Sequence, residues 1–261
     1  TQAPGLDIYS VAPDRLDLSG DTACLIVQQP GFLGQMEDVE ALSKQAHASG
    51  ALLVVSADPM SLGMFKPPAE YDADIVVGEG QTLGIPPTYG GPYVGLFACK
   101  QKYIRQMPGR IVGKTVDTQG REGYVLTLQT REQHIRRERA TSNICTSVGL
   151  IALMSTVYVA AQGRRGLRHV AELCYHKAHY AASLIEKIPG YSLPLQNTFF
   201  REFVVQCPIE PAEINRRLLE RKIIGGLDVS DQVPNGMLFC CTEVNTREEI
   251  ENLTGALSDI G

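Results

Sequence analysis

The residues best placed for chemistry lie where apolar runs of the sequence end. Asp58 follows the apolar run 51–56, and the run 74–77 leads into the segment that contains Gln81. In a parallel sheet functional side chains gather where strands end, so this layout predicts an active-site rim. Burying the Asp58 carboxylate without a cationic partner is costly, so it needs a cation or contact with solvent. The simpler interpretation is an Asp-Pro turn or a helix start.

Two glycine-containing segments follow Asp58 and could bind a phosphate through their backbone N–H groups. They are Gly78-Glu79-Gly80 and Tyr89-Gly90-Gly91-Pro92. Glycines before proline usually form turns, so a turn is the default interpretation. The sequence has no G-x-G-x-x-G motif after its first strand and no G-K-[ST] loop, which argues against nicotinamide and nucleoside-triphosphate binding.

A basic cluster lies just before a helix N-cap signal. It consists of His134, Arg136, Arg137 and Arg139, followed by Thr141, Ser142 and Asn143. Arginine suits two-point contact with a carboxylate or phosphate, so the cluster is either a solvated face or a surface that contacts another subunit. Further along, His176 and His179 have i,i+3 spacing, but no carboxylate or cysteine motif accompanies them, so we expect no metal site.

The elements that must position these residues can be read from hydrophobic periodicity. Strands are expected at 23–28, 51–56 and 75–77, with a helix at 36–48, an order typical of a parallel sheet. A strand at 92–99, a short helix at 101–107, a hairpin at 109–123 and a strand segment at 124–128 follow, then long helices at 143–162 and 166–188. Beyond residue 191 we expect strands at 202–207 and 237–242, a helix at 210–222, and a last helix opened by the Thr246–Glu249 capping box.

Short motifs in a fixed order, strongest between residues 56 and 145, resemble one family. They are Gly78-Glu79-Gly80-Gln81, Gly84-Ile85-Pro86, Tyr89-Gly90-Gly91-Pro92, Met107-Pro108-Gly109-Arg110, 128–137 (LQTREQHIRR) and 140–146 (ATSNICT). Together they closely resemble subunit 1 of the two-subunit glycine dehydrogenase (decarboxylating), the P-protein of the glycine cleavage system. The resemblance implies an α/β, pyridoxal-phosphate-dependent aspartate aminotransferase-like fold, with part of the large-domain sheet and a C-terminal α+β small domain.

Within that fold, the resemblance gives Asp58 and Gln81 defined positions. An Asp pairs with the pyridine nitrogen of the cofactor, and a later Lys binds the cofactor covalently as a Schiff base. Asp58 matches the Asp, but Gln81 stands at the position of the Lys, and an amide cannot form a Schiff base. Lys66 and Lys100 are the nearest alternatives, although neither follows the strand after Asp58. In the family, subunit 1 lacks the lysine and subunit 2 carries it, which agrees with Gln81.

The resemblance implies that this chain contains no catalytic residue and that Asp58 and Gln81 are relic cofactor positions. Pyridoxal phosphate would be bound by subunit 2, glycine would be decarboxylated there, and the aminomethyl group would pass to the lipoyl H-protein. Residues expected to support the site from across the interface are Tyr89, Gly90, Gly91, His134, Arg136, Arg137, Thr141, Ser142 and Asn143. The alternatives are a non-catalytic scaffold and a self-sufficient pyridoxal-phosphate enzyme of another reaction type.

Length and composition set wider limits. The 261 residues suffice for one large domain or two modest ones, and we expect a large-domain part at 1–138, linker helices at 139–190 and a small domain at 191–261. A net charge of -5 argues against nucleic acid, and no apolar run is long enough to span a bilayer. Seven cysteines without metal spacing and no leader suggest a cytoplasmic protein. The resemblance does not include the N-terminal part of the family's sequence, so we expect this chain to be a C-terminal fragment. Sheet surface that the N-terminal part would cover should then be exposed and favour self-association.

Overall fold

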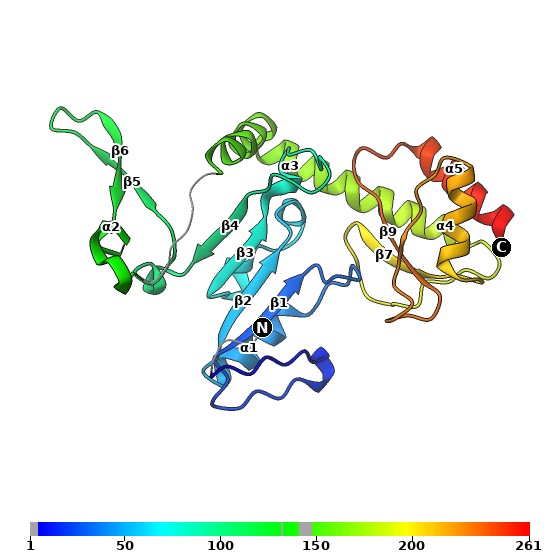
Figure 1. Ribbon diagram of the computed structural model, residues 1–261, viewed down its shortest axis with the longest axis horizontal. Coiled ribbons are helices and arrows are strands. Elements are labelled where there is room, and N and C mark those ends of the chain that lie inside the picture. Colours follow the sequence, from blue (N-terminus) through cyan, green and yellow to red (C-terminus); the bar gives the residue numbers. More distant parts are fainter. Residues whose placement is uncertain (1–4, 132, 141–147) are drawn as a thin grey trace.

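The computed structural model of the protein describes residues 5–131, 133–140 and 148–261. A four-stranded sheet with its crossover elements forms an N-terminal body, and a smaller sheet with two helices forms a C-terminal body (Figure 1). One long helix, α3 (Gly149–Ile185), runs from the first body to the second. The residues Thr141, Ser142 and Asn143, and the expected start of a helix at 143, lie outside the described residues.

The N-terminal sheet has the strand order β1-β2-β3-β4. Its strands are β1 (Cys24–Gln29), β2 (Leu52–Ala57), β3 (Ile75–Glu79) and β4 (Gly95–Cys99). The first three are parallel, and β4, which lies within the strand expected at 92–99, is antiparallel to β3. The crossover helix α1 (Val39–Ala48) starts later than expected, because Asp38 caps it by accepting a hydrogen bond from the Ala41 N–H.

A hairpin is present as β5 (Ile111–Val116) and β6 (Glu122–Thr127), and it is longer than expected, because residues 124–127, expected as a separate strand segment, belong to its second strand. The ribbon projects from the N-terminal body together with the short helix α2 (Gln133–Arg136) (Figure 1). The helix expected at 101–107 was wrong, since only a 3-10 turn forms at Gln101–Tyr103. Pro108 explains the difference, because a residue before proline avoids the helical region.

The two long helices expected from the sequence form α3 as two segments that meet at Gly163. Gly163 has φ 58° and ψ -176°, a non-helical conformation that glycine adopts at little cost, and the helix is kinked there. Buried alanines and Ile185 mark the second segment, which packs into the core of the C-terminal body. No helix within the described ranges combines the length and the hydropathy that a membrane span requires.

The C-terminal body is an antiparallel sheet in the order β7-β9-β8, covered by two helices and the end of α3. Its elements are β7 (Glu202–Gln206), α4 (Pro211–Glu220), β8 (Leu227–Asp228), β9 (Gly236–Cys240) and α5 (Arg247–Ile260). The capping box that opens α5 is formed in full, as expected. The two-residue strand β8 was not expected, because two residues are too few to carry a periodic signal.

Candidate functional site

The carboxyl edge of the N-terminal sheet brings together the two residues that the sequence singled out. Asp58 directly follows β2, and Gln81 lies in the 3-10 turn Gly80–Thr82 that directly follows β3. The hydroxyl of Thr82 donates to Oδ1 of Asp58 at 3.5 Å, so the two strand ends are in contact. The amide N–H of Met60 also donates to Oδ1, at 3.0 Å, which fixes the orientation of the carboxylate.

Asp58 has a cationic partner that was not singled out from the sequence. Nη2 of Arg201, from the segment just before β7, lies 2.9 Å from Oδ2 of Asp58, and the two side chains are only 16% and 15% exposed. Nε of Arg201 donates to Oε1 of Glu202 at 3.0 Å. Burial opposes the charge of Arg201, but Asp58 and Glu202 outweigh it and raise the pKa of the guanidinium. The ion pair therefore joins the sheet edge to the C-terminal body.

The glycine segment before Gln81 already uses its backbone donors. Oε1 of Glu79 accepts hydrogen bonds from the N–H of Gln81 at 3.1 Å and from the N–H of Val94 at 3.0 Å. The N–H of Gly80 donates to the Val94 carbonyl at 2.8 Å. A carboxylate in this position also repels a phosphate, so the segment is poorly suited to hold one.

The glycines of the same segment are explained by close packing. A Cβ on Gly78 would lie 2.6 Å from the carbonyl oxygen of Ala57, and a Cβ on Gly80 would lie 2.6 Å from Cγ1 of Val94. Strands β2 and β3 and the start of β4 could not approach one another as closely with larger residues. The segment Tyr89-Gly90-Gly91 is a turn with positive φ at all three residues, and Tyr89 is fully exposed.

Neither alternative lysine is placed as a cofactor lysine would be. Lys100 follows β4 and lies at the amino edge of the parallel strands, opposite Asp58, because Cys99 pairs with the first residue of β3. Its Nζ is 2.8 Å from Asp72 and 2.9 Å from Asp74. Lys66 forms an ion pair with Glu40 of α1. Both ammonium groups are thus paired with acidic side chains.

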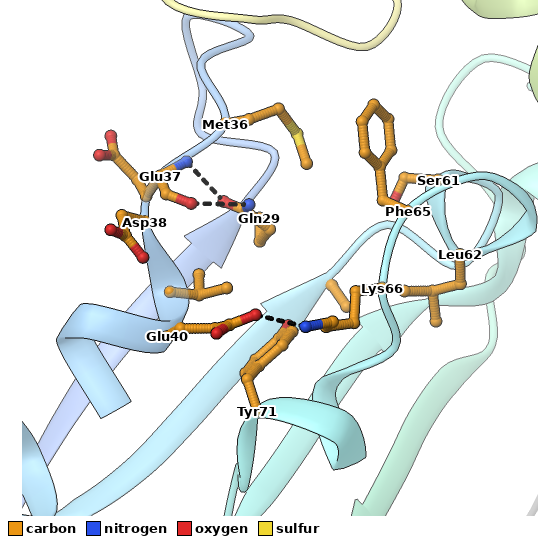
Figure 2. Close-up of a pocket in the computed structure, with 12 residues that line it drawn as sticks. Gln29, Met36, Glu37, Asp38, Glu40, Ser61, Leu62, Phe65, Lys66 and Tyr71 are labelled. Atoms are coloured by element: carbon orange, nitrogen blue, oxygen red, sulfur yellow. Dashed lines mark hydrogen bonds and ion pairs between the residues drawn. The ribbon is translucent and has the colours of Figure 1, made fainter. Parts of the chain in front are cut away.

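A cleft of about 280 Å³ lies between α1 and the segments that follow β2. Figure 2 shows Phe65, Leu62 and Tyr71 facing Met36 and Glu40 across it. Gln29, at the end of β1, closes one side by exchanging hydrogen bonds with the backbone of Glu37. Burial raises the pKa of Tyr71 to about 12, so its phenol is neutral at physiological pH.

Comparisons with known proteins assign this chain to a family. A family model described as glycine cleavage system P-protein matches residues 2–257. A probable glycine dehydrogenase (decarboxylating) subunit 1 from Thermomicrobium roseum is 54% identical over 93% of this chain and 55% of its own length. The chain belongs to the P-protein family of the glycine cleavage system. It spans about half the length of the curated relatives that it matches.

Solved structures agree with this assignment and extend it to the fold. A crystal structure of glycine decarboxylase (P-protein) in inhibitor-bound form matches with a TM-score of 0.89 at 43% identity, over 94% of this chain and 56% of that one. An alanine–glyoxylate aminotransferase from Nostoc sp. matches with a TM-score of 0.60 at 18% identity, over 91% and 61%, a likeness that shows the fold alone. The aminotransferase-like fold expected from the sequence is confirmed.

The residues of this P-protein chain do not fit pyridoxal phosphate, the cofactor that the fold implies. Residue 81 is a glutamine and has no amine, Asp58 is paired with a guanidinium of the same chain, and the donors of the glycine segment are occupied. Asp58 and Gln81 lie at adjoining strand ends, which offer neither an amine nor an unpaired carboxylate.

The basic cluster lies apart from Asp58, at the base of the projecting hairpin (Figure 1). The side chains of His134, Arg136 and Arg137 are exposed. His179, in contrast, stacks on Phe199 with ring centroids 3.9 Å apart, and burial lowers its pKa. In the described part of the chain no group of three or more His, Cys, Asp or Glu side chains could hold a metal ion.

Proposed function

We propose that this chain is part of subunit 1 of a glycine dehydrogenase (decarboxylating), and that it supports an active site whose cofactor is bound by subunit 2. The observation that carries the proposal is the pair of strand-end residues, Asp58 and Gln81. The resemblance assigns these two residues to the cofactor positions of the fold, yet Gln81 has no amine and Asp58 is paired with Arg201. The name of the relative from Thermomicrobium roseum supports the same assignment.

In the assembled enzyme, glycine would lose CO2 at pyridoxal phosphate bound covalently to subunit 2, and the aminomethyl group would pass to the lipoyl group of H-protein. The cofactor supplies an electron sink for the decarboxylation. This chain would contribute shape and charge from across the subunit interface. Residues 1–138 would form part of the large domain, residues 139–190 would link the domains, and residues 191–261 would form the small domain.

The residues that we propose for contact with subunit 2 are an exposed turn with an aromatic side chain and a separate basic cluster. Their described members are Tyr89, Gly90, Gly91, His134, Arg136 and Arg137. Tyr89 is fully exposed on a turn, and the three basic side chains are exposed beside the hairpin. Exposed aromatic and arginine side chains are the types most enriched at protein interfaces. Thr141, Ser142 and Asn143 belong to the same proposal from the sequence.

The decisive experiment mixes the full subunit containing this chain with subunit 2 and measures exchange of labelled CO2 into glycine. We expect exchange only when both subunits are present, with pyridoxal phosphate bound to a lysine of subunit 2. Exchange by subunit 2 alone at the same rate would support the scaffold alternative. Exchange by this subunit alone would support a self-sufficient enzyme and contradict the proposal.

Replacing Arg136 or Arg137 by Ala in the full subunit should lower the exchange rate of the mixed enzyme about tenfold or more. Removing one partner of a buried interfacial charge pair costs about 2–5 kcal/mol, whereas a rim arginine contributes little. Arg216→Ala is the matched control, because Arg216 is an exposed arginine on α4 of the C-terminal body. If both variants assemble and exchange at the unmodified rate, the cluster is a solvated face.

A further inference from the structure

The two bodies meet at a junction built from backbone, apolar and charged contacts. Gln35 and Phe199 form an isolated antiparallel bridge, and the N–H of Met36 donates to the Thr198 carbonyl at 2.9 Å. Met60 and Phe200 pack with α3 in one buried apolar cluster. The Asp58–Arg201 ion pair lies directly beside Phe200 and completes the junction.

The surroundings of Arg201 are rich in acids. Asp58 and Glu202 both contact the guanidinium, at 2.9 and 3.0 Å. Nearby, Sγ of Cys174 donates to Oε2 of Glu243 at 3.3 Å, and the thiol stays protonated because burial raises its pKa to about 12. An anionic cofactor phosphate gains little from a cation that two carboxylates already neutralise.

We propose that Arg201 takes the place of a cofactor in this chain: it is the permanent cation of Asp58, and the ion pair fixes the C-terminal body against the carboxyl edge of the sheet. The same ion pair that makes Asp58 unsuited to pyridoxal phosphate therefore has a structural role. The chain closes the site with its own side chain and needs no ligand there to hold its two bodies together.

The chemistry of arginine suits this role. A guanidinium is charged at all physiological pH values and offers donors in two directions, so it can contact Asp58 and Glu202 together. Both members of the pair are mostly buried, and removing either leaves a charge without its partner in a poorly solvated place. The contribution of each residue to stability should therefore depend on the presence of the other. This dependence distinguishes a clamp, meaning an ion pair that holds the two bodies together, from two independent surface charges.

A double-mutant cycle tests this dependence in the full subunit. Asp58→Asn and Arg201→Leu should each lower Tm by roughly 6 °C or more, and the double variant should be no less stable than the worse single variant. The exposed pair Arg168–Glu172 of α3 provides the control cycle, and its two substitutions should change Tm little. Additive losses from Asp58 and Arg201 would overturn the proposal.

Two further measurements separate a clamp from general destabilisation. Hydrogen exchange in Arg201→Leu should accelerate both in 58–64 and in 240–245, on opposite sides of the junction, while Arg201→Lys should restore part of the protection. Acceleration confined to 240–245 would contradict the clamp.

Pyridoxal phosphate added to the unmodified subunit should leave Tm unchanged. A rise in Tm that Asp58→Asn abolishes would show that Asp58 binds the cofactor, and the proposal would be wrong.

Discussion

Two aspartates at opposite edges of the N-terminal sheet solve the same problem of buried charge in different ways. Asp74, at the amino edge, is 1% exposed and has partners within its own body. It contacts Nε2 of His47 at 2.8 Å, Nζ of Lys100 at 2.9 Å and the N–H of Leu53 at 3.0 Å. Asp58, at the carboxyl edge, takes its ion-pair partner, Arg201, from the C-terminal body.

The difference separates a charge that holds one body together from a charge that joins two. Lys100 directly follows β4 and His47 belongs to the crossover helix α1, so this cluster can form as the sheet folds. The Asp58–Arg201 pair forms only when the C-terminal body docks. Loss of Asp74 should therefore unfold the sheet, whereas loss of the junction should loosen one body against the other.

The largest expected effect is that of Asp74→Asn. The substitution leaves Lys100 and His47 facing a neutral amide in a buried place, and we expect a loss of about 3 kcal/mol in the free energy of unfolding, measured with urea. Asp72→Asn is the control, because Asp72 contacts the same two side chains but its side chain is 69% exposed. Equal losses for the two variants would show that burial does not decide the strength of the cluster.

The same variant should change the dependence of stability on pH. Although burial opposes ionisation of Asp74, hydrogen bonds from His47, Leu53 and Lys100 outweigh it and lower the pKa of Asp74 in the folded protein. Stability from a lowered pKa is fully present above the unfolded value, about 4, and is lost as the pH falls toward the folded value. The gap between the unmodified protein and Asp74→Asn should therefore be constant near neutrality and shrink below about pH 4.

Gly34→Ala should have the next largest effect, and it acts at the junction. Gly34 has φ +91°, and a Cβ there would lie 2.0 Å from the backbone oxygen of Glu202, so the two bodies must move apart. We expect a loss of about 2 kcal/mol or more. Gly50→Ala is the control that separates backbone strain from the clash with Glu202, because Gly50 has φ +82° but a Cβ there would meet open space. Equal losses would mean that backbone strain, not the junction, accounts for the effect.

The elements of the fold followed from local signals, whereas the junction did not. Apolar runs predicted β1, β2 and β3, and the Thr246–Glu249 capping box predicted the start of α5, because each signal lies within a few residues. The partner of Asp58 lies on the segment before β7, in the other body, and no periodicity connects them. The only local signal of this ion pair was that Arg201 precedes Glu202 at the start of a strand. That position did not indicate which acidic side chain Arg201 would contact.

The smallest expected effect is that of Gln81→Lys, which should not allow this chain to bind pyridoxal phosphate covalently. A lysine reacts as a nucleophile only when its pKa is lowered. At position 81 the backbone is held by Glu79, and Asp58 lies at the adjoining strand end, so nearby carboxylates favour the unreactive ammonium form.

The test is borohydride reduction with pyridoxal phosphate, followed by peptide mass mapping of residue 81. The test is more discriminating when it includes the double variant Gln81→Lys, Arg201→Leu. This variant removes the ion-pair partner of Asp58 and leaves Glu79 in place. We expect no stoichiometric label at residue 81 in either variant, since the occupied donors of the glycine segment still offer no phosphate site. A full label in Gln81→Lys alone would show that the missing amine was the only defect of the site. A full label in the double variant alone would show that Arg201 is what keeps the site closed to the cofactor.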